Sequence, residues 1–112
     1  MAFLEAAFGF TRTLVVDGED GRAIRHAELR WPLGGGVMLG SAVEDGDEFA
    51  RLPTGNVSLY VVTNEPDALF ARATAAGAAV VRELVDTDYG SRDFAVRDPE
   101  GNIWSFGTYR GT

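Results

Sequence analysis

The stretch that decides the fold lies near the start of the chain: Phe3-Leu4-Glu5-Ala6-Ala7-Phe8-Gly9-Phe10. Its pattern predicts a helix, then a glycine, then a strand. The apolar residues of residues 2–8 lie on one helical stripe, and Gly9 follows as a C-cap before a strand over 10–16. The same order recurs about 68 residues later, where Gly77 ends a second helix and a strand follows at 79–85. The chain therefore contains two copies of one unit.

The remaining elements follow from hydrophobic alternation and turn residues. In the first copy we expect further strands at 24–31 and 37–41. In the second we expect a strand at 57–62, a helix capped by Thr63 or Asn64 with Pro66 near its first position, and later strands at 92–97 and 103–108. The turn at 98–102, Asp-Pro-Glu-Gly-Asn, has a structural role because proline and glycine set its backbone angles.

This pattern predicts an α+β fold of two tandem βαβββ modules that form a curved mixed sheet around a cavity, with the first strand of module one missing. We expect residues 1–112 to form a single domain, with module one at 1–41, a linker at 42–56 that contains the acidic run 44–48, and module two at 57–112. Three explanations for the missing strand stay open: an upstream start codon, a partner chain that fills the gap, or a tolerated open edge.

Composition narrows the function classes. The formal net charge is −7, and all ten bases are arginines. An acidic domain without a basic stripe is a poor candidate for binding nucleic acid, whereas it suits a neutral or cationic small molecule; the charge can also serve solubility alone. The chain has no cysteine, which excludes disulfides and thiolate zinc sites. The first residues lack the features of a signal peptide, and no run of apolar residues is long enough to span a membrane. We therefore expect a cytoplasmic protein.

Three blocks of sequence resemble the vicinal-oxygen-chelate (glyoxalase/bleomycin-resistance/dioxygenase) superfamily. The first-helix text at 3–10 is similar to that family's first helix. The text His-Ala-Glu-Leu at 26–29 with Gly-Val-Met-Leu at 36–39, and the block at 89–94 followed by 97–104, resemble its PhnB-like branch. The resemblance covers nearly the whole chain, and it implies the fold and a ligand cavity.

The resemblance also implies where metal ligands would stand in metal-dependent relatives, which use His and Glu from the first and last strands of each module. In module two these positions fall on Ser58 and Ser105, and in module one the last-strand position falls near Leu39. Hydroxyl and aliphatic side chains are poor ligands for a divalent cation. We therefore expect no metal and no other cofactor.

The only histidine, His26, shares one strand face with Glu28 and Arg30. Ala27, Leu29 and Trp31 share the opposite, apolar face and should pack under the helices. Facing the cavity, His26 and Glu28 are candidate acid–base catalysts, and His26, Glu28 and Arg30 are candidate ligand-binding residues. A salt-bridged polar strand face is the alternative interpretation.

Further candidates for ligand binding lie in module two. Ser58 and Tyr60 alternate to one face of their strand, as Ser105 does on the last strand, and ordinary strand filling is the competing interpretation. Arg92 with Phe94 is expected to point inward, where Arg92 can hold an anionic group, or pair with Asp86, Asp88 or Asp93 instead.

The sequence leaves three hypotheses of function open. The first is a metal-free domain that sequesters a small molecule, such as an amphipathic or cationic compound, and forms a homodimer as relatives of the bleomycin-resistance type do. The second is an enzyme (lyase, isomerase or dioxygenase), metal-dependent or acid–base. The third is a dimeric interaction module without a ligand. The sequence does not name the ligand or the reaction.

Overall fold

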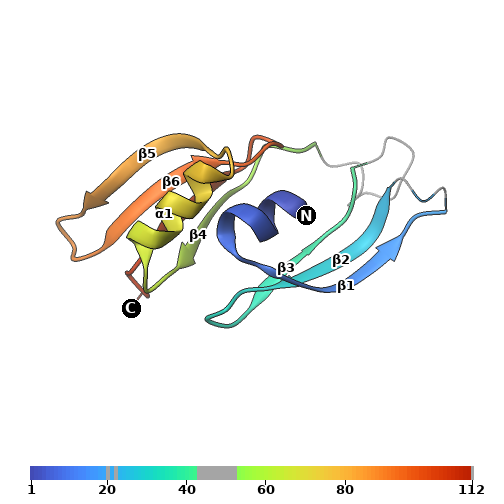
Figure 1. The fold of residues 1–112 in the computed structure, drawn as a ribbon, viewed down its shortest axis with the longest axis horizontal. Helices are drawn as coiled ribbons and strands as arrows, with labels where there is room; N and C mark the ends of the chain where they lie inside the picture. The colour runs from blue at the N-terminus through green and yellow to red at the C-terminus, as the bar shows by residue number, and fades with distance from the viewer. Residues whose placement is uncertain (20, 22, 43–52, 112) are drawn as a thin grey trace.

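The computed structural model describes residues 1–19, 21, 23–42 and 53–111. The predicted acidic run at 44–48 lies outside these residues. Along the described chain the elements are η1 (Leu4–Phe8), β1 (Thr11–Asp17), β2 (Ile24–Arg30), β3 (Gly36–Leu39), β4 (Ser58–Val62), α1 (Pro66–Ala75), β5 (Ala79–Asp86), β6 (Arg92–Arg97) and β7 (Ile103–Gly107), shown in Figure 1. Neither helix is long and apolar enough to cross a membrane.

The strands form two sheets, which confirms the predicted α+β class. One sheet has the order β1-β2-β3 and is antiparallel, and the other has the order β4-β7-β6-β5, in which β4 runs parallel to β7. The second half is thus a complete βαβββ module. In the described residues of the first half, no strand precedes η1, as expected from the repeat. The strands of the predicted curved mixed sheet are divided between two sheets, and β3 and β4 are the edge strands at which these sheets approach each other.

Local sequence explains where the two helices begin and end. Gly9 adopts a left-handed conformation (φ 84°) and its N–H donates to the carbonyl of Glu5, as expected of the predicted C-cap. Pro66 opens α1, as predicted. The predicted cap by Thr63 or Asn64 is wrong, because Glu65 directly precedes that proline and takes the cap position. Thr63 Oγ1 instead accepts a hydrogen bond from the Glu65 N–H at 3.2 Å.

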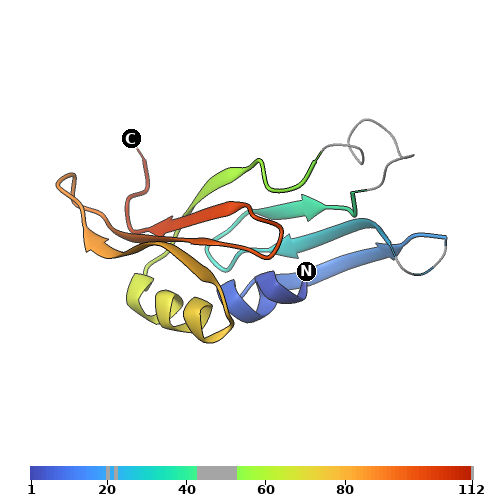
Figure 2. The ribbon, with the colours of Figure 1, turned by 90° about the horizontal axis from the view of Figure 1, so that it is seen from above.

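Both helices pack side by side on the same side of the sheets (Figures 1 and 2). The core lies between the helices and the sheets. Its aromatic centre is Phe106, whose ring lies 4.7 Å from that of Phe8, 5.4 Å from that of Phe94 and 5.8 Å from that of Trp31. Trp31 directly follows β2, the middle strand of the first sheet, and its indole N–H donates to the carbonyl of Val62 on β4 at 2.9 Å. The two halves therefore share one core.

The turn at 98–102 has the structural role expected of it. Asp98 Oδ1 accepts hydrogen bonds from the N–H groups of Glu100 and Asn102, at 2.9 and 3.0 Å. Asp98 Oδ2 accepts one from the indole of Trp104 at 2.9 Å. This carboxylate ties the turn to the last strand and so fixes the register in which β6 and β7 meet.

Candidate functional site

The side of the sheets opposite the helices is left without a covering helix, and we call it the uncovered face. Strand alternation decides which side chains reach it. In the first sheet Ala27, Leu29 and Trp31 are buried in the core, as predicted, so that His26, Glu28 and Arg30 lie on the uncovered face. Neighbouring strands add apolar side chains there, and these are exposed: Leu14, Val16 and Met38.

His26 and Glu28 form a pair on this face. His26 Nε2 lies 3.0 Å from Glu28 Oε2, and the two side chains are 41% and 36% exposed. This geometry serves either interpretation offered by the sequence, an acid–base pair or a polar strand face. Met38 pairs in register with Glu28 and is 73% exposed, so the apolar surface around the pair is open to solvent.

In the second sheet the uncovered face includes Ser58, Tyr60 and Ser105. Leu59 and Trp104 pack toward the core, and register places Tyr60 beside Ser105 on the opposite face. The structure therefore brings these three predicted residues together on one surface, the same one that carries His26 and Glu28 in the other sheet. Alternation along the strands predicted this arrangement.

Arg92 and Phe94 do not lie on this surface. Phe94 is fully buried and packs against Phe70 of α1, with ring centroids 5.1 Å apart. Arg92 reaches Asp67 of α1 through Nε at 2.6 Å and Asp86 through Nη1 at 3.2 Å. The expectation that Arg92 and Phe94 point into the cavity is wrong, because even-numbered residues of β6 face the helices. Its alternative, an ion pair with Asp86, is what the structure has.

Alternation on β6 places Asp93 on the uncovered face instead. Its carboxylate is fully buried, accepts a hydrogen bond from Arg82 at 3.0 Å through Oδ1 and another from the Tyr89 hydroxyl at 3.2 Å through Oδ2. The sequence could have predicted this position. If Phe94 and Val96 are assigned to the core, then Asp93 must lie on the opposite face, since neighbours on a strand point to opposite faces.

Tyr89 belongs to a group of three linked tyrosines, which we call the tyrosine cluster: Tyr60, Tyr89 and Tyr109. The Tyr60 hydroxyl donates to the carbonyl of Tyr109 at 2.7 Å, and the rings of Tyr89 and Tyr109 lie 5.6 Å apart. The pKa of Tyr89 is raised above its usual value, first by the loss of solvent around its hydroxyl and second by its hydrogen bond to Asp93. The cluster covers part of the uncovered face of the second sheet.

The ion pair on the helix side makes a testable prediction. The hydrogen bond from Arg92 holds the pKa of Asp67 below its usual value. We expect Arg92→Gln to raise that pKa, measured by following the Asp67 carboxyl signal by NMR as a function of pH. A lowered pKa stabilises the fold above the unfolded-state pKa, and this contribution is lost as the pH falls through the folded-state value. In Arg92→Gln, the free energy of unfolding should therefore fall less steeply as the pH drops through the range in which Asp67 titrates.

Arg82→Gln is the matched control, because Arg82 pairs with Asp93 and not with Asp67. It should leave the titration of Asp67 unchanged. An equal shift in both variants would mean that general charge, and not the hydrogen bond from Arg92, lowers the pKa of Asp67.

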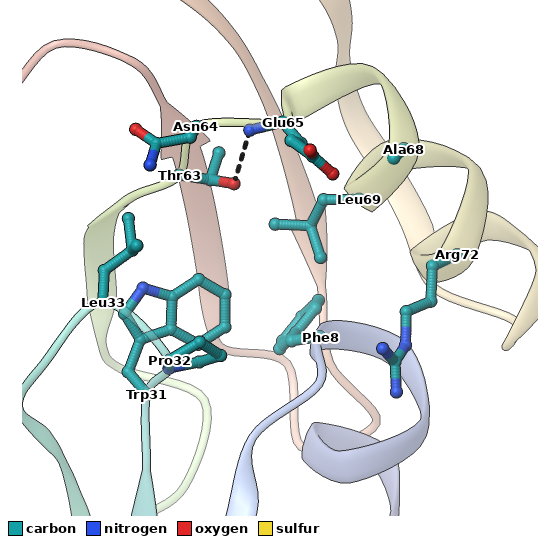
Figure 3. Close-up of a pocket in the computed structure, with 10 residues that line it drawn as sticks. All are labelled: Phe8, Trp31, Pro32, Leu33, Thr63, Asn64, Glu65, Ala68, Leu69 and Arg72. Atoms are coloured by element: carbon teal, nitrogen blue, oxygen red, sulfur yellow. Dashed lines mark hydrogen bonds between the residues drawn. The ribbon is translucent and has the colours of Figure 1, made fainter.

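Two pockets share Trp31 and Leu33 in their walls. The seam pocket, of about 380 Å³, lies where the end strands of the two sheets approach, and it is lined by Phe10, Trp31, Leu33, Gly34, Gly36, Val37, Tyr60, Val61, Val62 and Arg110. The helix-side pocket, of about 400 Å³, is lined by Phe8, Trp31, Pro32, Leu33, Thr63, Asn64, Glu65, Ala68, Leu69 and Arg72 (Figure 3). Both volumes lie in the range of small-molecule sites.

The positions implied for metal ligands do not form a metal site. Ser58 and Ser105 offer hydroxyl groups, and Leu39, the position named in module one, packs against the core. Its neighbour on the uncovered face is Met38, which offers only a thioether. Divalent cations that prefer nitrogen and carboxylate oxygen are poorly held by such a set. Among the described residues, no group of three or more His, Asp or Glu side chains is placed to hold one ion.

The repeated module, the helices on one side and the uncovered face on the other define a small α+β domain with an open sheet surface and a seam between its two sheets. A sequence profile described as Glyoxalase/Bleomycin resistance protein/Dioxygenase superfamily matches residues 1–106. The chain belongs to this superfamily.

Solved structures share the fold over most of their length. TioX from Micromonospora sp. ML1 is 34% identical with a TM-score of 0.75, over 95% of this chain and 84% of that one. A glyoxalase/bleomycin resistance protein from Streptomyces sp. CB03234 is 27% identical with a TM-score of 0.65, over 93% and 83% of the two chains.

The names of the sequence relatives described below state no function. An uncharacterized protein of Mycobacterium bovis is 37% identical over 110 residues, which is 94% of this chain and 71% of the relative. A Mycobacterium tuberculosis relative has the same identity, but this chain spans only 64% of its length.

Proposed function

We propose that this domain binds a small, partly apolar molecule without a metal, and that it acts by sequestration. The observation that carries the proposal is the seam pocket, where Phe10, Trp31 and Tyr60 offer aromatic surface beside a single cation, Arg110. Sites of this volume with mostly apolar walls and few polar groups are typical of small-molecule binding. The family positions for metal ligands carry hydroxyl and aliphatic groups, which supports binding without a chelated ion.

Four more of the predicted residues extend this site across the uncovered face. Ser58 lies on the same strand as Tyr60, Ser105 pairs with Tyr60 in register on β7, and His26 with Glu28 lies on the other sheet. A ligand seated in the seam can therefore place polar groups against either sheet. The acidic net charge of −7 favours neutral or cationic compounds over anions.

A thermal-shift screen of amphipathic and cationic compounds tests the proposal. A ligand present at a hundred times its Kd adds about 2.7 kcal/mol to the free energy of unfolding. We expect at least one compound to raise the Tm, and Tyr60→Ala to reduce that rise because it removes a wall of the seam pocket. Tyr89→Ala is the matched control, since Tyr89 is outside that pocket.

The absence of any stabilising compound would contradict the proposal, and so would equal loss in both tyrosine variants. Metal content, measured by elemental mass spectrometry on protein purified without chelators or a His tag, tests the metal-free part separately. A stoichiometric divalent ion would overturn that part.

The His26–Glu28 pair favours a second candidate function, acid–base catalysis on the uncovered face in a lyase or isomerase of the same superfamily. A histidine hydrogen-bonded to a carboxylate is held in one orientation and can exchange a proton with a ligand. Loss of turnover in His26→Ala with the fold intact would favour this function over sequestration.

The remaining parts of the proposal rest on the sequence motifs and on family resemblance. They are membership of the PhnB-like branch, a homodimer and a cytoplasmic location. Symmetric pairing is the commonest way to bury exposed sheet edges and faces. A single monomeric species in sedimentation at micromolar concentration would argue against the dimer.

A further inference from the structure

The helix-side pocket is a second candidate site, separate from the uncovered face. It lies under the beginning of α1, so that its walls come from both halves of the chain. Figure 3 shows Trp31 and Leu33 on one side of it and Leu69 and Phe8 on the other. Trp31, Leu69 and Phe8 are each less than a tenth exposed, so these walls are held in place by the core.

The side chain of Trp31 offers this pocket an aromatic surface that needs no hydrogen-bond partner from a ligand. Its only hydrogen-bonding group, the indole N–H, already donates to the carbonyl of Val62 at 2.9 Å. What remains is the ring, which can stack with a flat apolar group or lie against a cation. The ring stays where it is because it packs between Phe10, at 4.8 Å, and Phe106, at 5.8 Å.

The polar groups at the rim favour a ligand that donates hydrogen bonds. Arg72 is turned toward η1, where Nε donates to the carbonyl of Ala6 and Nη2 to that of Glu5, each at 2.9 Å. The Glu65 N–H is taken by Thr63 Oγ1. The carboxylate of Glu65 is exposed at the rim, and it has no hydrogen-bond or ion-pair partner among the residues that the structure describes. The Glu65 carboxylate is therefore the charged group at the rim that is left open to a ligand, whereas the guanidinium of Arg72 keeps its positive charge but is directed to the carbonyls of η1.

We infer that the helix-side pocket binds a small aromatic ammonium compound, whose ring lies between Trp31 and Leu69 and whose cationic group meets the Glu65 carboxylate. The volume of about 400 Å³ admits a bicyclic ring with a short amine chain. This site shares Trp31 and Leu33 with the seam pocket, but Glu65 and Leu69 line only the helix-side pocket and so distinguish the two.

Three probes of matched shape test the inference: naphthylethylammonium, the neutral naphthylethanol and the anionic naphthylacetate. Each is titrated into isotope-labelled protein and followed by proton–nitrogen NMR. The chain has two tryptophans, so the indole N–H of Trp31 reports on the pocket and that of Trp104, bonded to Asp98, reports on the intact fold. We expect the ammonium to shift the Trp31 signal, with the Trp104 signal unchanged.

Glu65→Gln should weaken binding of the ammonium by a factor between about 1.4 and 5, the range of a solvent-exposed charge pair, and leave binding of the alcohol unchanged. Ala68→Phe, which fills the rim from an exposed position on α1, should abolish binding of both. Tyr60→Ala should affect neither, because Tyr60 lines the seam pocket alone.

Equal ammonium affinity in the wild type and Glu65→Gln would overturn the inference, and so would tighter binding of naphthylacetate. Loss of the ammonium in Tyr60→Ala but not in Ala68→Phe would place the ligand in the seam pocket. That outcome would support the proposed function and overturn the helix-side site. Failure of the seam screen leaves the helix-side result unaffected, since Glu65→Gln and Ala68→Phe change residues that line only the helix-side pocket.

Discussion

Replacing Phe106 with alanine is expected to lower the free energy of unfolding by about 3–5 kcal/mol, a cost typical of truncating a buried aromatic residue. Phe106 is fully buried and its ring contacts those of Phe8, Trp31 and Phe94, so it joins η1 and the first sheet to the second. The lost ring would leave a cavity that three rigid aromatic neighbours cannot fill. Urea denaturation followed by circular dichroism measures the change.

Phe106→Leu is the control for this prediction. Leucine keeps more of the buried volume than alanine does, so Phe106→Leu should lower the free energy of unfolding by less than Phe106→Ala. An alanine variant no less stable than the leucine variant would contradict the role of Phe106 as the residue that joins the two halves.

Gly107→Ala is expected to destabilise the protein by about 1–3 kcal/mol through overpacking. A Cβ at this position would lie 2.6 Å from Tyr60 Oη, 2.8 Å from Asp93 Cβ and 2.9 Å from Ser91 Oγ. None of these atoms moves easily, because Tyr60 is bonded to the carbonyl of Tyr109 and Asp93 is fully buried between Arg82 and Tyr89. The glycine is required for close approach, and its backbone is not in the left-handed region.

A double variant separates this clash from backbone strain. Tyr60→Phe removes the hydroxyl nearest to the new methyl group, so Gly107→Ala should cost less in that background. Gly77→Ala is the matched control: Gly77 has φ 93° and open space around it, so its cost comes from the backbone alone. Tyr60→Phe should not change that cost. Equal costs of Gly107→Ala in both backgrounds would contradict the clash.

Much of the fold could be predicted because its signals are local. Period-two and helical alternation placed the strands and helices within a residue or two of their observed ends. The repeat around Gly9 and Gly77 predicted two copies of one module. The side on which His26, Glu28, Ser58, Tyr60 and Ser105 lie also followed from alternation, because a strand turns successive residues to opposite faces.

The inward direction of Arg92 was predicted wrongly for a physical reason. An arginine beside a phenylalanine is compatible with either face of a strand, and the deciding partners, Asp67 on α1 and Asp86 on β5, are separated from it in sequence. The same holds for Asp93, whose burial depends on Arg82 and Tyr89 coming from other elements. Ion pairs across elements exist only once the sheets and helices have packed.

The sequence by itself determined the class of fold, the family and the set of side chains on each strand face, because these depend on residue types at short spacing. Only the tertiary structure decided where ligands can enter. Both pockets form around Trp31, whose neighbours in space, such as Tyr60 and Leu69, lie far from it in the chain. A pocket is a property of surfaces brought together from distant segments, and no local pattern encodes the distance between them.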